Sequence, residues 1–165
     1  MLKKTIQTDL NNAIKLNDEI TRNTLRMLLS FILNKEKDKR YKISKEEPEL
    51  GKEELDEKSN LTEEETLEAV FSEVKKRKEA VKEYERGQRN DLADKEKKEL
   101  EILKRYMPEQ LSEQELKSLI KEAIDKLEIK DIKGLGKVMA ELMPKVKGRT
   151  DGSEISRIVK ELLQS

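Results

Sequence analysis

The stretch "LTEEETLEAVFSEVKKRKEAVKEYERG", residues 61–87, contains a complete amphipathic helix with its start and stop signals. Thr62 and Glu65 have the spacing of a capping box, in which each side chain satisfies a free backbone N–H group of the first turn. Apolar residues then recur every three or four positions, which is the period of one helix face; they are Leu67, Val70, Phe71, Val74, Val81 and Tyr84. Gly87 fits the position after the helix, where glycine tolerates a positive φ.

The same period recurs on both sides of this stretch and predicts an all-α protein. Further helices are expected over residues 2–16, 19–39, 90–107, 112–127, 131–143 and 151–163. Two of them begin with additional capping-box pairs, Ser112 with Glu115 and Asp151 with Glu154. Only 3% of the residues are aromatic and there are three prolines, whereas β-sandwiches and barrels need more aromatic residues and more frequent turn signals.

Breaks in the pattern predict the domain organisation. Residues 41–60 contain Pro48 and Gly51 among many acidic residues and are expected to form a loop or a frayed insertion. Pro108 marks a boundary between an N-terminal domain of two helix pairs, residues 1–110, and a C-terminal domain of three helices, residues 111–165.

Two further predictions come from the glycine and proline residues in and after the helix expected over residues 131–143. Gly134 and Gly136 lie in its first turns, where glycine weakens a helix, so they predict a close helix–helix approach. Pro144 and Gly148 are expected to end that helix.

Composition excludes several kinds of active site. The chain of 165 residues has no cysteine and no histidine, so thiol nucleophiles, cysteine-ligated metals and Ser-His-Asp triads are ruled out. We therefore expect no catalytic residues, no metal and no cofactor. No apolar run approaches the roughly 20 residues that span a bilayer, and no signal peptide is recognisable, so we expect a cytoplasmic protein without membrane contact.

Charge is balanced overall, with 36 basic and 36 acidic residues, but it is segregated along the chain. Residues 133–160 carry seven cations and three anions. Within them Lys145, Lys147 and Arg149 alternate between two helices. One cation there is explained by the dipole at a helix end. Three mutually repelling cations fit a nucleic-acid phosphate better.

Other cations complete the predicted nucleic-acid site. Lys137 and Arg157 belong to the same basic segment as the alternating cations. In the N-terminal domain, Arg22 and Arg26 lie one helical turn apart and could form a phosphate fork, with an ion pair to a neighbouring helix as the alternative.

A second basic stretch lies in the third predicted helix. Lys76 and Arg77, within "KKRK" at 75–78, could form a basic face that contacts nucleic acid. The alternative is a solvated face whose cations pair with acids one turn away.

Several blocks of the chain together resemble the GatB/YqeY family. They are "TLRMLLSFILNKEKDKR", "LTEEE", "EVKKRKEAVKEYERGQRNDLADKEKKELEILKRYMPEQLSEQEL" and "LGKVMAELMPKVKGRTDGSEISRIVKELL", spread over residues 20–163. Their order matches the stand-alone YqeY-like proteins. The last block also resembles the C-terminal domain of the B subunit of glutamyl/aspartyl-tRNA amidotransferase. The segment 43–60 is longer than the family leads us to expect.

This resemblance implies an all-helical two-domain fold and a function in translation. It implies a non-catalytic tRNA-binding accessory module, in a family associated with carbon–nitrogen ligation that takes its amide nitrogen from glutamine. Expected partners are tRNA, bound through backbone and shape, and an aminoacyl-tRNA synthetase or amidotransferase subunit. The alternative is a module that docks on such a protein through helical grooves. Catalysis by the chain alone is the third and least favoured possibility.

Overall fold

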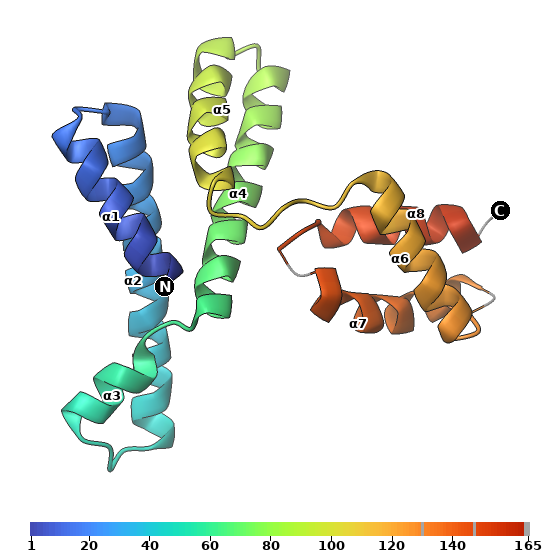
Figure 1. Cartoon of the computed structure of the whole chain (residues 1–165), viewed down its shortest axis with the longest axis horizontal. Helices are drawn as coiled ribbons and strands as arrows, with labels where there is room; N and C mark the ends of the chain where they lie inside the picture. The colour runs from blue at the N-terminus through green and yellow to red at the C-terminus, as the bar shows by residue number, and fades with distance from the viewer. Residues whose placement is uncertain (130, 147, 164–165) are drawn as a thin grey trace. The chain divides into compact units, whose positions relative to one another are not determined.

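The computed structural model describes residues 1–129, 131–146 and 148–163 and divides the chain into two compact units, Met1–Tyr106 (unit 1) and Met107–Ser165 (unit 2). The predicted all-α class is confirmed, since the described residues form helices and turns without a strand (Figure 1). Each unit has its own apolar core.

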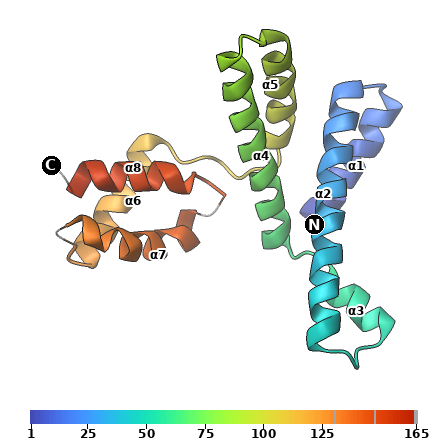
Figure 2. The ribbon, with the colours of Figure 1, turned by 180° about the vertical axis from the view of Figure 1, so that it is seen from behind.

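Unit 1 contains five helices, four of which pack around the fifth and longest one. They are α1 (Leu2–Lys15), α2 (Glu19–Glu46), α3 (Lys52–Ser59), α4 (Glu63–Arg86) and α5 (Asn90–Lys104). Helix α2 packs against all four others, and α4 and α5 form a second helical hairpin (Figures 1 and 2). The buried apolar side chains come from the predicted stripes, among them Ile6, Leu10, Leu25, Leu28, Ile32, Val70, Val74, Leu100 and Leu103.

The loop predicted over residues 41–60 is wrong. Helix α2 continues to Glu46, and α3 forms a further helix after a turn that holds Pro48 and Gly51. Sequence periodicity missed α3 because ion pairs rather than apolar side chains attach it to α2. Arg40 pairs with Asp56, and the Lys58 ammonium lies 2.6 Å from a carboxylate oxygen of Glu47.

Both ends of α4 follow the sequence prediction, but the left-handed residue lies one position later than predicted. Thr62 Oγ1 accepts from the backbone N–H of Glu65 at 3.1 Å, and the Glu65 carboxylate accepts from that of Thr62 at 2.7 Å. Gly87 follows the helix, but its φ is −80°, and the positive φ falls on Gln88, at 56°. The prediction of a positive φ at Gly87 is therefore wrong, because the left-handed position is one residue further along.

Unit 2 packs three helices around one core. They are α6 (Glu113–Lys126), α7 (Leu135–Val146), which follows the 3₁₀ turn η1 (Ile132–Gly134), and α8 (Gly152–Leu163). The capping box of Ser112 and Glu115 is present. The three helices contact one another in pairs. Their shared core contains Leu116, Ile120, Ala123, Val138, Leu142, Val146, Ile155, Ile158 and Val159. All of these except Val146 belong to the predicted apolar stripes.

Two local predictions in unit 2 are corrected. Pro144 lies inside α7, which runs to Val146. A proline in the last turn removes only the hydrogen bond to the carbonyl four residues earlier, so the helix survives it. At the start of α8, the Asp151 carboxylate accepts from the backbone N–H of Ser153 at 2.9 Å, and Glu154 accepts from the Thr150 hydroxyl at 3.3 Å. Side chains still satisfy the first turn, but not in the predicted reciprocal pattern.

Hairpin α4–α5 is held by a nearly buried ion cluster around Arg77. The Arg77 side chain is only 11% exposed, and its guanidinium lies 2.9 Å from Glu99 and 3.2 Å from Glu96, both on α5. It also contacts the sulfur of Met27 on α2 at 3.8 Å. The cluster therefore connects three helices of unit 1 at one point.

Replacing Arg77 with alanine should strongly destabilise unit 1. The substitution Arg77→Ala leaves two largely buried carboxylates without their cation, and such a loss costs about 3–5 kcal/mol. The matched control is Arg86→Ala, whose side chain is 78% exposed and pairs with Glu83 on the same helix, and it should cost less than about 1 kcal/mol. Urea denaturation followed by circular dichroism measures both, and equal effects would contradict this account of the cluster.

The two glycines near α7 behave differently from one another. A Cβ atom on Gly134 would lie 2.3 Å from the Ile129 side chain, whereas one on Gly136 would meet nothing within 4 Å. The predicted close approach is thus correct for Gly134, although the neighbour is a side chain in the preceding turn and not a helix. For Gly136 the prediction is wrong.

Alanine at these two glycines should change stability in opposite directions. Gly134→Ala overpacks the site beside Ile129 and should cost about 1–3 kcal/mol. Gly136→Ala fills open space in a helix and should stabilise unit 2 by about 0.5–1 kcal/mol. Thermal unfolding of both variants checks this, and a stabilising Gly134→Ala would show that Ile129 moves aside freely.

Candidate nucleic-acid interface

Glu141 on α7 is shared by two lysines of unit 2. One oxygen of its carboxylate lies 2.8 Å from the Lys145 ammonium on the same helix and 2.9 Å from that of Lys126 on α6. Lys137 stands four residues before Glu141, which places it one turn away on the same face of α7. We call these four residues the Glu141 cluster. It contains three cations and one anion.

The electrostatics of the cluster follow from this geometry. Hydrogen bonds from Lys145 and Lys126 lower the pKa of the Glu141 carboxyl from its ordinary 4.5 to about 2. Glu141 therefore remains ionised at any pH at which the protein would act. Two ammonium groups share this one carboxylate, and Lys137 adds a further cation one turn away on α7.

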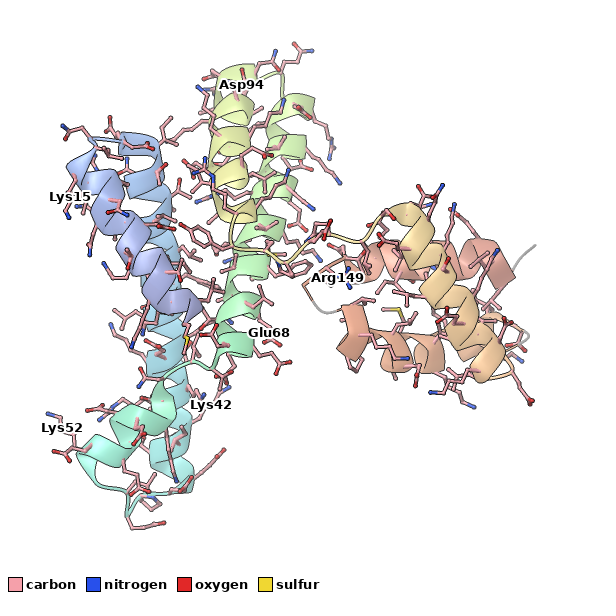
Figure 3. All side chains as sticks on the ribbon, viewed as in Figure 1. Lys15, Lys42, Lys52, Glu68, Asp94 and Arg149 are labelled. Carbon is pink, nitrogen blue, oxygen red and sulfur yellow. The ribbon has the colours of Figure 1, made fainter. Side chains whose placement is uncertain are left out.

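Arg149 has a structural contact as well as a charge. It lies in the turn between α7 and α8 (Figure 3). Its Nε donates to the carbonyl of Glu109 at 3.1 Å, and its own carbonyl accepts from the N–H of Leu111 at 3.0 Å. Gln110 reinforces this by donating to the Gly148 carbonyl at 3.0 Å. Arg149 thus ties the segment before α6 to the turn. The neighbouring candidate, Lys147, lies outside the described residues.

Arg157 lies on α8 between two acids of its own helix. Its guanidinium is 2.6 Å from Glu161 and 4.0 Å from Glu154. These pairs compensate its charge locally. The structure therefore brings Lys137 and Lys145 together on one helix face and places Arg157 on another helix with its own partners.

The candidates of unit 1 have different surroundings. Arg22 pairs with Glu19 on its own helix at 3.5 Å, so the expected partner on a neighbouring helix is not the one found. Arg26 is exposed and has no ion pair within the part of the chain that the structure describes. The guanidinium of Arg77 is occupied by two carboxylates, as described above, so we leave Arg77 out of any phosphate-binding surface.

Lys76 also has local partners. Its ammonium lies 2.7 Å from Glu73 on the preceding turn and 4.1 Å from the centre of the Phe31 ring on α2. An ammonium over an aromatic face is attracted by the ring quadrupole. Lys76 therefore helps to hold α4 against α2, and "KKRK" does not form one continuous basic face.

Sequence reasoning missed Lys126 as a member of the site. It lies in the last turn of α6, and only the packing of α6 on α7 brings it to Glu141. The one available signal was the isolation of Glu141, an acid within a basic segment, which marks a place where cations can converge.

Residues 1–129, 131–146 and 148–163 contain no group of three or more acidic side chains placed to hold a metal ion. In the same ranges no helix is both long and apolar enough to cross a membrane.

Comparison with known proteins relates the chain to one family. Residues 47–163 match the family model described as Yqey-like protein. A Pyrenophora tritici-repentis protein named "Altered inheritance of mitochondria protein 41, mitochondrial" is 26% identical over 161 residues, which cover 96% of this chain and 78% of that protein. Proteins of the same name from Vanderwaltozyma polyspora and Candida glabrata are 29% and 28% identical over 62% and 64% of this chain. The matches span about half of these two yeast proteins, 46% and 49%.

The titration of Glu141 tests the geometry of the cluster. Its depressed pKa means that the stability it contributes is present above pH 4.5 and is lost as the pH falls toward about 2. Lys145→Ala should raise the pKa of Glu141 while Lys126 still holds it below 4.5. Carboxyl chemical shifts measured by NMR follow this. Glu113, whose pKa is lowered by Lys117, is the internal control and should not change. A Glu141 pKa near 4.5 in the unsubstituted chain would refute the cluster.

Proposed function

Because the chain belongs to the YqeY-like protein family, we propose that it is a non-catalytic accessory module that binds tRNA through the α6–α7 face of unit 2. The proposal rests on the Glu141 cluster, where Lys126 and Lys145 share one carboxylate and Lys137 lies one turn away on α7. Phosphate groups of a nucleic-acid backbone bind such sets of lysines and release their counterions on doing so.

The choice of a folded RNA is supported by what the surface offers. Only 3% of the residues are aromatic, which gives little surface for stacking the bases of a single strand. Lysines are point charges that contact phosphates without reading base edges. A surface of this kind suits a folded RNA recognised by its backbone and shape. The resemblance of the last sequence block to the C-terminal domain of the amidotransferase B subunit supports tRNA as that RNA.

The chemistry of the chain supports an accessory role in translation. Without histidine or cysteine it lacks the commonest general base and the thiol nucleophile. Glutamine-dependent ligation would need a partner, and an amidotransferase subunit or an aminoacyl-tRNA synthetase is the partner class that the resemblance implies. We propose that the module acts in the cytoplasm. The mitochondrial names of the fungal relatives describe those proteins.

The salt dependence of tRNA binding tests this proposal. In the full chain, the triple substitution Lys126→Ala, Lys137→Ala and Lys145→Ala should weaken binding of bulk tRNA. It should also reduce the slope of log K against log salt by about two to three units, since each lost phosphate contact removes about 0.7–0.9. Filter binding over a series of salt concentrations measures both quantities.

A charge-matched control separates a site from a general charge effect. Lys82→Ala, Lys98→Ala and Lys104→Ala together remove three exposed lysines from unit 1 and should leave the slope unchanged. Glu141→Gln removes the only acid of the cluster and should tighten binding. If both triple variants lose affinity equally, or if Glu141→Gln weakens binding, the α6–α7 face is not the tRNA site.

A further inference from the structure

Helix α3 differs from the other helices of unit 1 in how it is attached. It packs against α2 and against no other helix in the part of the chain that the structure describes (Figures 1 and 2). Ser59 is the one buried residue of α3, and its other side chains are half-buried or exposed. Each of the other helices of unit 1 buries at least three residues. Hydrophobic burial therefore contributes little to the position of α3.

Ion pairs at the surface hold α3 instead. The Arg40 guanidinium on α2 pairs with the carboxylate of Asp56 on α3. On the other side of the connecting turn, the Lys58 ammonium lies 2.6 Å from the carboxylate of Glu47. The four side chains of these two pairs are 33–56% exposed. Exposed pairs of this kind contribute little to stability and are weakened further by salt.

The segment that contains α3 is acidic, and the end of α2 beside it is basic. Residues 46–57 contain seven carboxylates and one lysine, whereas residues 35–45 contain six cations and two carboxylates. One of those two carboxylates, Glu36, is 8% exposed and accepts from Lys3 of α1. The chain thus folds an acidic segment back on the basic end of its longest helix.

Helix α3 is also too short to be stable by itself. Isolated helices of fewer than about 12–15 residues are marginal in water, and α3 has eight residues. Elements with few buried apolar contacts open locally while the rest of a domain stays folded. Salt favours this opening, because charges at the surface are screened beyond about 10 Å at 0.1 M ionic strength and beyond about 3 Å at 1 M. We therefore expect α3 to detach before any other helix of unit 1.

We propose that α3 is an autoinhibitory strap, whose carboxylates cover the basic end of α2 until the phosphate backbone of an RNA displaces them. When α3 is open, residues 35–45 present a net charge of +4 over about 15 Å of helix, at 1.5 Å per residue. When α3 is closed, the surplus of six carboxylates in residues 46–57 offsets that charge. A row of lysine and arginine side chains binds phosphates and releases their counterions.

Contact with RNA can begin before the strap opens. Lys37, Lys42 and Lys45 are exposed in the closed structure, so a phosphate backbone can reach them while α3 is still in place. Arg40 becomes available only when Asp56 leaves it. Lys39 donates to the carbonyl of Asn60, directly after α3, at 3.0 Å. The strap therefore controls the half-buried cations of the row.

This inference goes beyond the proposed tRNA binding, since it concerns unit 1 and a control exerted by the chain itself. The RNA measurements use the full chain with Lys126→Ala, Lys137→Ala and Lys145→Ala, which removes the site proposed in unit 2. Masking by the strap is therefore measured whether or not the Glu141 cluster binds tRNA, and the two proposals fail independently.

Hydrogen exchange measures the opening of α3. Raising sodium chloride from about 0.05 to 1 M should speed exchange of the Leu55–Ser59 amides at least about fivefold and leave those of Val70 and Val74 in α4 unchanged. Asp56→Asn removes the partner of Arg40 and should give the fast exchange at low salt. Glu57→Gln removes the same charge at the next position, which is exposed and has no ion pair among the described residues, and should have no effect.

Two charge-matched variants measure the masking. Asp56→Lys and Glu57→Lys change the charge of α3 by the same amount, but only the first breaks the pair with Arg40. Bulk tRNA followed by fluorescence anisotropy should bind Asp56→Lys at least about fivefold more tightly than Glu57→Lys. Adding Lys37→Ala and Lys42→Ala should abolish that gain, because both lysines belong to the row that the strap covers.

Three results would overturn the strap. The amides of α3 could exchange alike in Asp56→Asn and Glu57→Gln, which would show that the pair with Arg40 does not hold it. Equal tRNA affinities of Asp56→Lys and Glu57→Lys would show that opening uncovers no binding surface. A gain that survives Lys37→Ala and Lys42→Ala would place the bound RNA elsewhere.

Discussion

The fold of unit 1 depends on ion pairs placed where helices meet, because hydrophobic residues make up only 34% of the chain. Its apolar stripes are narrow, and charged side chains complete several of the contacts. Arg77 joins α4 to α5 and reaches Met27 on α2. Glu36 is 8% exposed and accepts from Lys3 on α1 at 2.6 Å and from the backbone of Leu61 at 3.2 Å. Removing one member of such a pair leaves the other charge buried without a partner, which lowers the free energy of unfolding. These ion pairs therefore specify which helices pack together.

The two units use charge in opposite ways. In the hairpin α4–α5 the carboxylates outnumber the cation that they surround, and the cluster is largely withdrawn from solvent. Around Glu141 the cations outnumber the carboxylate, and the group lies on the surface. A closed ion cluster stabilises a fold, whereas an open cluster with excess charge can still bind an ion of opposite sign. This contrast is the physical reason why we give Arg77 a structural role and propose tRNA contact for the lysines of the Glu141 cluster.

Sequence alone predicted the parts of the fold that short-range rules control. The capping boxes at Thr62 and Ser112 and the core stripes of unit 2 depend on residues three or four apart. It failed for α3, which is attached by ion pairs between residues distant in sequence. The candidate site divided in the same way. The sequence singles out Lys137 and Lys145 but places Lys145 beyond the end of the helix, whereas α7 carries both, and Lys126 joins them only through tertiary packing. A basic stretch in the sequence also gave no indication that Arg77 would be nearly buried.

Three helix ends share a backbone feature that bears on how the protein could be strengthened. After α1, α4 and α6 the chain reverses through Asn17, Gln88 and Glu128, all with positive φ, and each turn closes with the paired hydrogen bonds of a Schellman motif. Side chains other than glycine are strained there by roughly 1 kcal/mol. Glycine at Gln88 would release that strain without altering the apolar core or the Glu141 cluster, because Gln88 is exposed and belongs to unit 1. The melting temperature of the protein could therefore be raised by a substitution in such a turn, with the surface around Glu141 left unchanged.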